Sequence, residues 1–235
     1  MTYSESWLVL LARVLGDEIP SSQKPDAAYL VGETAYNGLS VLLRGSELWK
    51  GGVVPRIAIQ ANGEGYGYCG YEYSLHKLKE EGVPSTAIVP MYICQEFIDA
   101  KCVNTLSEMI SVARLAKKSS WRSIYLVAPH FHQLRSFLTM VTALDKEYPE
   151  LLVYNRVGMP LPWNESVIHS QGVLTGTRLK LFVEELNRIQ AYQNPVSVNP
   201  LLMPLVSIER GIAYLNERDR RAFYFMGGMY HDISF

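Results

Sequence analysis

The sequence predicts an α/β protein with an open, mainly parallel, Rossmann-like sheet of about five strands and helices on both faces. Two observations lead to this fold class. Short apolar runs alternate with helix-length amphipathic segments, as parallel strands buried on both faces require. The chain has 235 residues, of which 48% are hydrophobic, so it is long enough for one α/β domain with a large core. We therefore expect a single domain over residues 1–235.

The expected strands are apolar runs bounded by Gly, Pro or Asn. They are 27–31, 56–60, 86–89, 123–128 and 151–154. The expected helices repeat apolar residues every three or four positions, so that one stripe faces the sheet. They are 36–49, 71–81, 104–117, 132–146 and 177–192. The alternating order favours parallel strands that are joined by crossover helices.

Both ends of the chain are less regular. The apolar segment 7–12 follows Glu5 and is interrupted by Arg13, so we interpret it as a buried amphipathic helix, not as a signal peptide or a membrane span. The two prolines in residues 159–164 predict a loop there. Residues from about 176 to 235 are expected to form a C-terminal helical and aromatic extension, with a further helix at 207–217 and an aromatic tail, Phe223-Tyr224-Phe225, packed on the domain.

The charge balance and the cysteines exclude several classes of protein. Lys and Arg number 22 against 23 Asp and Glu, so no strong basic field points to nucleic acid or to an anionic membrane. Cys69, Cys94 and Cys102 form no C-x-x-C pair, and their odd number favours a reducing compartment. We therefore expect a cytoplasmic protein without a structural zinc site.

The candidate site residues follow the ends of the predicted strands, because ligands of open parallel sheets bind beyond the carboxyl ends of the strands. They are Gly32 and Glu33 after the first strand, Asn62, Gly63 and Glu64 after the second, and His130, His132 and Arg135 after the run at 123–128. Gly65-x-Gly67-x-x-Gly70 has the spacing of the dinucleotide fingerprint. It lies outside the first strand–helix turn, so we do not interpret it as a dinucleotide site.

His130, His132 and Arg135 carry the chemistry expected of this crevice. Arg135 is placed at a helix start, where a guanidinium and free backbone N–H groups suit a phosphate or a carboxylate. One imidazole can then act as acid or base, because its unperturbed pKa is about 6.5. Two imidazoles two residues apart also suit a metal, but a third ligand is not evident nearby, so no metal is expected. The alternative to a functional role is a structural one, in which one histidine caps the helix and the other is exposed to solvent.

Asn104, Thr105 and Glu108 open another predicted helix. The local interpretation is an N-cap followed by an acidic first turn, which stabilises a helix by about 1 kcal/mol. The functional interpretation places Asn104 and Thr105 in the crevice, with Glu108 behind them as an orienting carboxylate. The residues alone leave both interpretations open.

Several segments, taken in order over about residues 26–157, resemble the SanA/YdcF/ElyC-like family. They are Tyr29-Leu30-Val31-Gly32, Ile59-Gln60-Ala61-Asn62-Gly63 with Glu72 in the next helix, Asn104-Thr105-Leu106-Ser107-Glu108-Met109, and Val127-Ala128-Pro129-His130-Phe131-His132-Gln133-Leu134-Arg135. The chain departs from the family pattern where Ala128-Pro129 replaces a hydroxyl pair and Met109 replaces a second Asn. The resemblance implies a Rossmann-like fold with a polar crevice, and S-adenosylmethionine as a candidate cofactor.

The leading hypothesis is a small-molecule enzyme that acts on a nucleotide-like or phosphorylated ligand. Gly63, Asn104, Thr105 and Arg135 would hold the anion, and His132 would be acid or base with Glu72 or Glu108 orienting it. Transferase and hydrolase versions are not distinguished. One alternative is a module that binds a nucleotide or S-adenosylmethionine without turnover. Another is an assembly protein with a homo-oligomer interface of aromatic residues, namely Tyr66, Tyr68, Tyr71 and the tail at 223–225.

Overall fold

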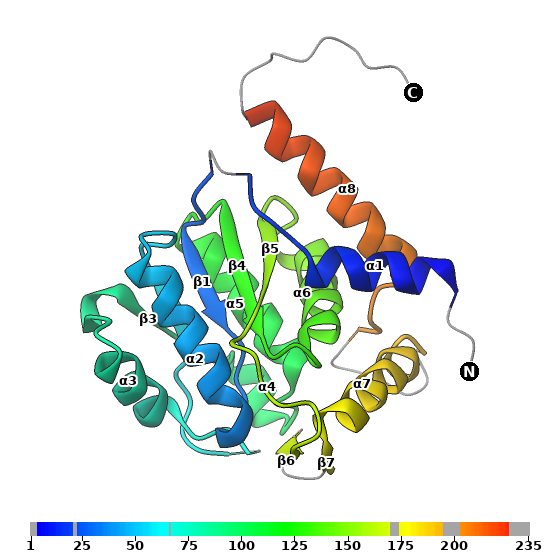
Figure 1. Cartoon of the computed structure of the whole chain (residues 1–235). Helices are drawn as coiled ribbons and strands as arrows, with labels where there is room; N and C mark the ends of the chain where they lie inside the picture. The colour runs from blue at the N-terminus through cyan, green and yellow to red at the C-terminus, as the bar shows by residue number, and fades with distance from the viewer. Residues whose placement is uncertain (1–3, 21–22, 66, 170–173, 195–202, 226–235) are drawn as a thin grey trace.

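A five-stranded, all-parallel sheet forms the centre of the protein in our computed structural model, which describes residues 4–20, 23–65, 67–169, 174–194 and 203–225 (Figure 1). The strand order is β3-β2-β1-β4-β5. The strands are β1 (Ala27–Leu30), β2 (Ile57–Gln60), β3 (Ile88–Met91), β4 (Ser123–Ala128) and β5 (Leu152–Val157). The predicted fold class is confirmed.

Helices cover both faces of this sheet. One face carries α2 (Ala35–Lys50) and α3 (Tyr71–Glu80), and the other carries α5 (Thr105–Lys118) and α6 (Gln133–Glu147). Successive strand residues point to opposite faces, so β1 serves both cores. Tyr29 packs in the core with α5 and α6, whereas Leu30 packs in the core with α2. This double burial explains why the strands are continuous apolar runs.

The chain leaves β1 and β4 toward opposite faces, although these strands are neighbours. Tyr29 and Leu30 pair with Leu126 and Val127 in a parallel register. β1 then runs into α2 on one face, and β4 runs into α6 on the other. The crevice between two diverging connections is the usual ligand site of open α/β sheets. The fold therefore places the turns after β1 and β4 side by side.

The ends of the described chain pack together. α1 (Glu5–Leu15) lies beside α8 (Ile208–Phe225) and also contacts α6 and β5 (Figure 1). Leu10 of α1 is buried, as the expected amphipathic helix requires, and Gly211 of α8 lets that helix approach it closely. α8 extends beyond the predicted 207–217. The predicted contacts of the aromatic tail concern side chains outside the described residues.

A short hairpin after β5 was not predicted from the sequence. β6 (Ser166–His169) and β7 (Leu174–Thr177) form an antiparallel pair, followed by α7 (Arg178–Tyr192). Strands of four residues, one of them rich in Thr and Gly, are too short to show a period. The short helices η1 (Ser85–Ala87) and α4 (Gln95–Asp99) are also additions. None of the helices in the described ranges has the length and apolar character that crossing a membrane requires.

Hydrogen bonds dock this hairpin on the carboxyl edge of the sheet. The Thr34 hydroxyl donates to the Ile168 carbonyl over 2.8 Å. Arg178 is buried and donates to Asn37 Oδ1 over 3.1 Å and to the Tyr36 carbonyl over 3.2 Å, both on α2. Side chains alternate outward and inward along β6, so His169 points inward. The hairpin thus delivers one imidazole to the end of β1.

Candidate functional site

A polar pocket of about 90 Å³ lies beyond the carboxyl ends of β1, β2 and β4. It collects side chains from the turn after β1, from the first turns of α5 and α6, and from the C-terminal part of the chain. Seven of the residues predicted from the sequence line it: Gly32, Glu33, Asn104, Thr105, Glu108, His132 and Arg135. His169 and Arg188 line it as well.

His132 is held from one side by Glu33. It lies directly before α6, and its Nδ1 is hydrogen-bonded to Glu33 Oε1. The other ring nitrogen, Nε2, is buried and has no hydrogen-bond partner among the described residues. A carboxylate on Nδ1 fixes the ring orientation and leaves Nε2 as an acceptor, which is the arrangement of a general base.

A second histidine and a second glutamate lie opposite this pair. His169 Nε2 lies 3.2 Å from Oε1 of Glu185 on α7, and His169 Nδ1 lies 3.4 Å from Glu33 Oε2. Glu185 Oε2 lies 3.7 Å from His132 Nε2. The side chains of Glu33, His169 and Glu185 are each 2% exposed, so these contacts are buried.

Two arginines neutralise Glu185. Arg135 Nε forms an ion pair with Glu185 Oε2, and its Nη1 donates to the Thr105 hydroxyl over 2.8 Å. Arg188 Nη1 donates to Glu185 Oε1 over 3.0 Å. Arg135 was expected to bind an anionic ligand, but in the structure it pairs with the buried carboxylate of Glu185. Among the described residues, the hydrogen bonds of Arg135 are made by its Nε and Nη1 and not by its Nη2.

The buried charges shift one another's pKa values. Burial raises the pKa of Glu33, but the facing charges of His132 and His169 outweigh it and lower this pKa to about 2. Burial lowers the pKa of His169, but Glu33 and Glu185 outweigh it and raise this pKa to about 9. The pKa of His132 stays below its usual value because of burial and, next, the charge of Arg135. One imidazole is thus charged and the other neutral near pH 7.

Glu108 is a further buried carboxyl of the pocket. Its Oε1 accepts hydrogen bonds from the Tyr29 hydroxyl and from the Gly32 backbone N–H, at 2.5 and 2.8 Å. Burial raises the pKa of Glu108 to about 7, against the lowering effect of these two hydrogen bonds. A carboxyl that titrates near neutral pH can hold or release a proton inside the pocket.

Asn104 is the N-cap of α5, as the local interpretation of the sequence predicts, and it also lines the pocket. Its Oδ1 accepts hydrogen bonds from the Leu106 and Ser107 N–H groups, and Ser107 completes a capping box. Its side-chain oxygen is therefore occupied by the helix start. Glu108 lines the pocket too, where Tyr29 and Gly32 hold its carboxyl group, and it has no contact with His132 among the hydrogen bonds of the described residues.

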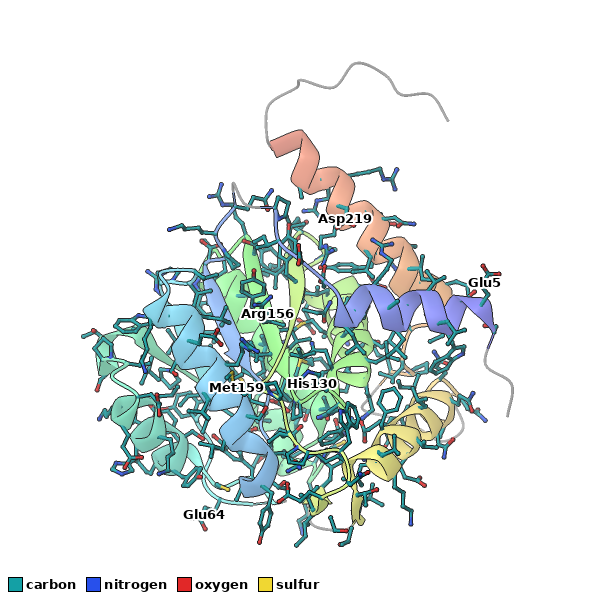
Figure 2. All side chains as sticks on the ribbon, viewed as in Figure 1. Glu5, Glu64, His130, Arg156, Met159 and Asp219 are labelled. Carbon is teal, nitrogen blue, oxygen red and sulfur yellow. The ribbon has the colours of Figure 1, made fainter. Side chains whose placement is uncertain are left out.

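The remaining predicted residues are not part of the pocket lining. Asn62 Oδ1 accepts from the Ile93 N–H over 3.0 Å and so fixes a neighbouring turn. Gly63 and Glu64 are exposed, and Figure 2 shows Glu64 at the outer edge of the molecule. Glu72 is exposed on α3, so the carboxylate that orients His132 is Glu33 instead. His130 packs its ring against Trp163, with centroids 6.3 Å apart.

Three residues of the pocket region were not predicted from the sequence: His169, Glu185 and Arg188. They follow the expected family-like core, and short-range spacing does not link them to Glu33 or His132. Glu185 offered one usable signal, since it is the apolar-face position of the helix that begins at Arg178, where a glutamate needs a buried partner.

No metal centre is evident in the part of the chain that the structure describes. There, no group of three or more His, Cys, Asp and Glu side chains is arranged to hold a metal ion. Cys69, Cys94 and Cys102 are free thiols. His130 and His132 do not converge, because only His132 enters the pocket.

Comparisons with known proteins add no family or relative. Neither a scan against protein-family models nor a search of curated proteins finds a match to this chain. The resemblance to the SanA/YdcF/ElyC-like family stays a prediction that rests on the quoted segments.

Proposed function

We propose that this protein is a small-molecule enzyme that acts on a phosphorylated or nucleotide-like ligand, with His132 as its general base. The observation that carries the proposal is the Glu33–His132 pair, in which Nδ1 is engaged and the buried Nε2 is not. A neutral imidazole in this arrangement accepts a proton from a water or a substrate hydroxyl. The low pKa of His132 keeps it neutral and ready to accept.

The charge of the pocket supports an anionic ligand. Arg135, Arg188 and a protonated His169 face two ionised carboxylates, Glu33 and Glu185, which leaves one net positive charge before Glu108 ionises. A phosphate or carboxylate would meet the unengaged Nη2 of Arg135. The pocket volume of about 90 Å³ is below the roughly 300–1,000 Å³ of sites that enclose a drug-sized ligand. The pocket therefore suits the reacting group of a larger ligand.

A thermal-shift screen followed by a turnover assay tests the proposal. The probes are inorganic phosphate, AMP, ATP, glucose 6-phosphate and S-adenosylmethionine, and products of each stabilising probe are followed by NMR. His132→Gln should retain the fold and lose turnover by about 100-fold or more, the usual contribution of a general base. His76→Gln, at an exposed position on α3, is the matched control.

Two results would contradict the proposal. His132→Gln with unchanged turnover would remove the assigned base. A probe that binds to the wild-type protein without ever forming product would favour a binding module, the alternative function.

A further inference from the structure

Glu33, His132, Glu185 and His169 form a closed ring in which carboxylates and imidazoles alternate. Each carboxylate oxygen faces one imidazole nitrogen, so the ring has four contacts. The contact of Glu33 Oε1 with His132 Nδ1 is the shortest, and those of His169 are 3.4 and 3.2 Å. The contact between His132 Nε2 and Glu185 Oε2, at 3.7 Å, is the longest. All four side chains are at most 4% exposed.

The two carboxylates of the ring are neutralised in different ways. Glu185 receives a guanidinium on each oxygen, from Arg135 and from Arg188. Glu33 has only the two imidazoles as ion-pair partners among the described residues. A buried carboxylate without a cation is costly, so one of these imidazoles must carry a charge while Glu33 is ionised.

His169 is the better placed of the two to carry that charge. Its Nε2 is hydrogen-bonded to Glu185 Oε1 at 3.2 Å, and its Nδ1 lies 3.4 Å from Glu33 Oε2 without hydrogen-bond geometry, so a doubly protonated ring would face a carboxylate on both sides. His132 has Arg135 as a close neighbour. Its Nε2 and His169 Nδ1 both lack a hydrogen-bond partner among the described residues, but the nearest carboxylate oxygen is farther from His132 Nε2, at 3.7 Å, than from His169 Nδ1, at 3.4 Å. In the resting state, three of the four imidazole nitrogens then carry a proton: both nitrogens of His169 and Nδ1 of His132. His132 Nε2 is the nitrogen without a proton.

We propose that these four side chains act as one proton-sharing unit, in which His169 is the resident cation and the ring closes fully when His132 Nε2 takes a proton from a bound hydroxyl or water. The proton leaves the O–H bond, the oxygen keeps the electron pair, and the new imidazolium faces Glu185 Oε2 as its fourth contact. His169 is a positioning residue, because its positive charge balances the negative charge of Glu33 while His132 stays neutral. This deepens the proposed function and rests on it only for the source of the proton.

Side-chain ¹⁵N NMR of the full-length protein tests the resting state without any substrate. The five histidines can be assigned by single His→Gln variants. At pH 7 we expect His169 to be an imidazolium and His132 to be neutral, with its proton on Nδ1. A wild-type spectrum in which His132 is the imidazolium, or in which both rings are neutral, would overturn the proposal.

His169→Gln then tests the coupling between the two rings. Loss of the resident cation should shift the titration of His132 upward by about 1 pH unit or more, since Glu33 must then draw its charge from His132. The other charged groups facing the ring are Arg135 from α6, Arg188 from α7 and Glu108 from α5, and they are unchanged in this variant. His76→Gln is the control and should move neither ring. An unshifted His132 in folded His169→Gln would refute the positioning role.

These measurements separate the ring from the enzyme activity. If His169→Gln does not fold, the wild-type spectrum still decides the protonation state. If no probe is turned over but the spectrum is as expected, the proposed function fails and the ring stands. If turnover depends on His132 while His169 titrates as an ordinary histidine, the function stands and the ring fails.

Discussion

The hydroxyl of Tyr29, a residue of the central strand β1, donates a hydrogen bond to Glu108 Oε1, in the first turn of α5. The same oxygen accepts from the Gly32 N–H, so the end of β1 and the start of α5 are joined through one carboxyl group. Gly32 has no Cβ that would meet the Gln60 side chain 2.5 Å away. Glu108 therefore couples the floor of the pocket to the core of the sheet.

Glu108→Gln should change how stability depends on pH. The folded protein binds the Glu108 proton more tightly than the unfolded chain, because burial raises its pKa to about 7. The resulting stabilisation is complete below about pH 4 and is lost as the pH rises through about 7. A glutamine does not titrate, so the variant should gain up to about 3 kcal/mol relative to wild type between pH 5 and pH 8.5. Urea unfolding at both pH values measures this.

The exposed substitution Glu209→Gln, on α8, should show no such change with pH. A constant difference in stability between Glu108→Gln and wild type at both pH values would contradict the raised pKa.

Tyr29→Phe should lower the free energy of unfolding, because a buried hydrogen bond to a carboxyl is lost. The expected loss is about 1 kcal/mol at pH 5, where Glu108 is protonated, and about 2 kcal/mol at pH 8.5, where the bond is charge-assisted. Tyr125→Phe is the control, since Tyr125 is buried in β4 and its hydroxyl has no hydrogen bond among the described residues. Equal losses in the two variants would remove the special role of Tyr29.

Arg135→Met should destabilise the protein even in the absence of a ligand. Arg135 is 5% exposed and neutralises a buried glutamate, so its removal should cost about 3 kcal/mol. Arg114→Met removes a half-exposed arginine from two surface ion pairs and should cost less than about 1 kcal/mol. Thermal unfolding compares the two, and similar melting temperatures would argue against a buried Arg135–Glu185 pair.

Arg178→Met should loosen the hairpin β6–β7. The Arg178 side chain also donates to the Pro162 carbonyl and to Glu165, so it ties both flanks of the hairpin to α2. We expect hydrogen exchange of the β6 amides to accelerate at least tenfold, with a loss of about 2–4 kcal/mol in stability. Lys180→Met, exposed two residues further on, is the matched control. Unchanged exchange at Val167 to His169 in Arg178→Met would show that other contacts dock the hairpin.

The fold was predictable because its determinants are local. Apolar runs such as 123–128 must be strands buried on two faces, and helical stripes such as 132–146 must cover them, whatever lies elsewhere in the chain. The turns after β1 and β4 follow from this pattern. For the same reason Glu33, His132 and Arg135 could be placed at one edge of the sheet from the sequence.

The partners of these residues were not predictable in the same way. The orienting carboxylate was expected in Glu72 or Glu108, yet it is Glu33, since only the turn after β1 brings a carboxylate to His132 Nδ1. Arg135 was expected to bind an anionic ligand, yet it forms an ion pair with Glu185 of α7.

The parallel sheet, its two helical layers and the polar edge follow from local sequence patterns, because periodicity and strand burial act over a few residues. The position of His169 depends instead on long-range packing. A hairpin of four-residue strands places it between Glu33 and Glu185, two glutamates that are 152 residues apart in the chain. Contacts over such separations depend on where α7 docks, and no local pattern encodes that position. The charge state of the site therefore belongs to the folded protein and not to any one segment.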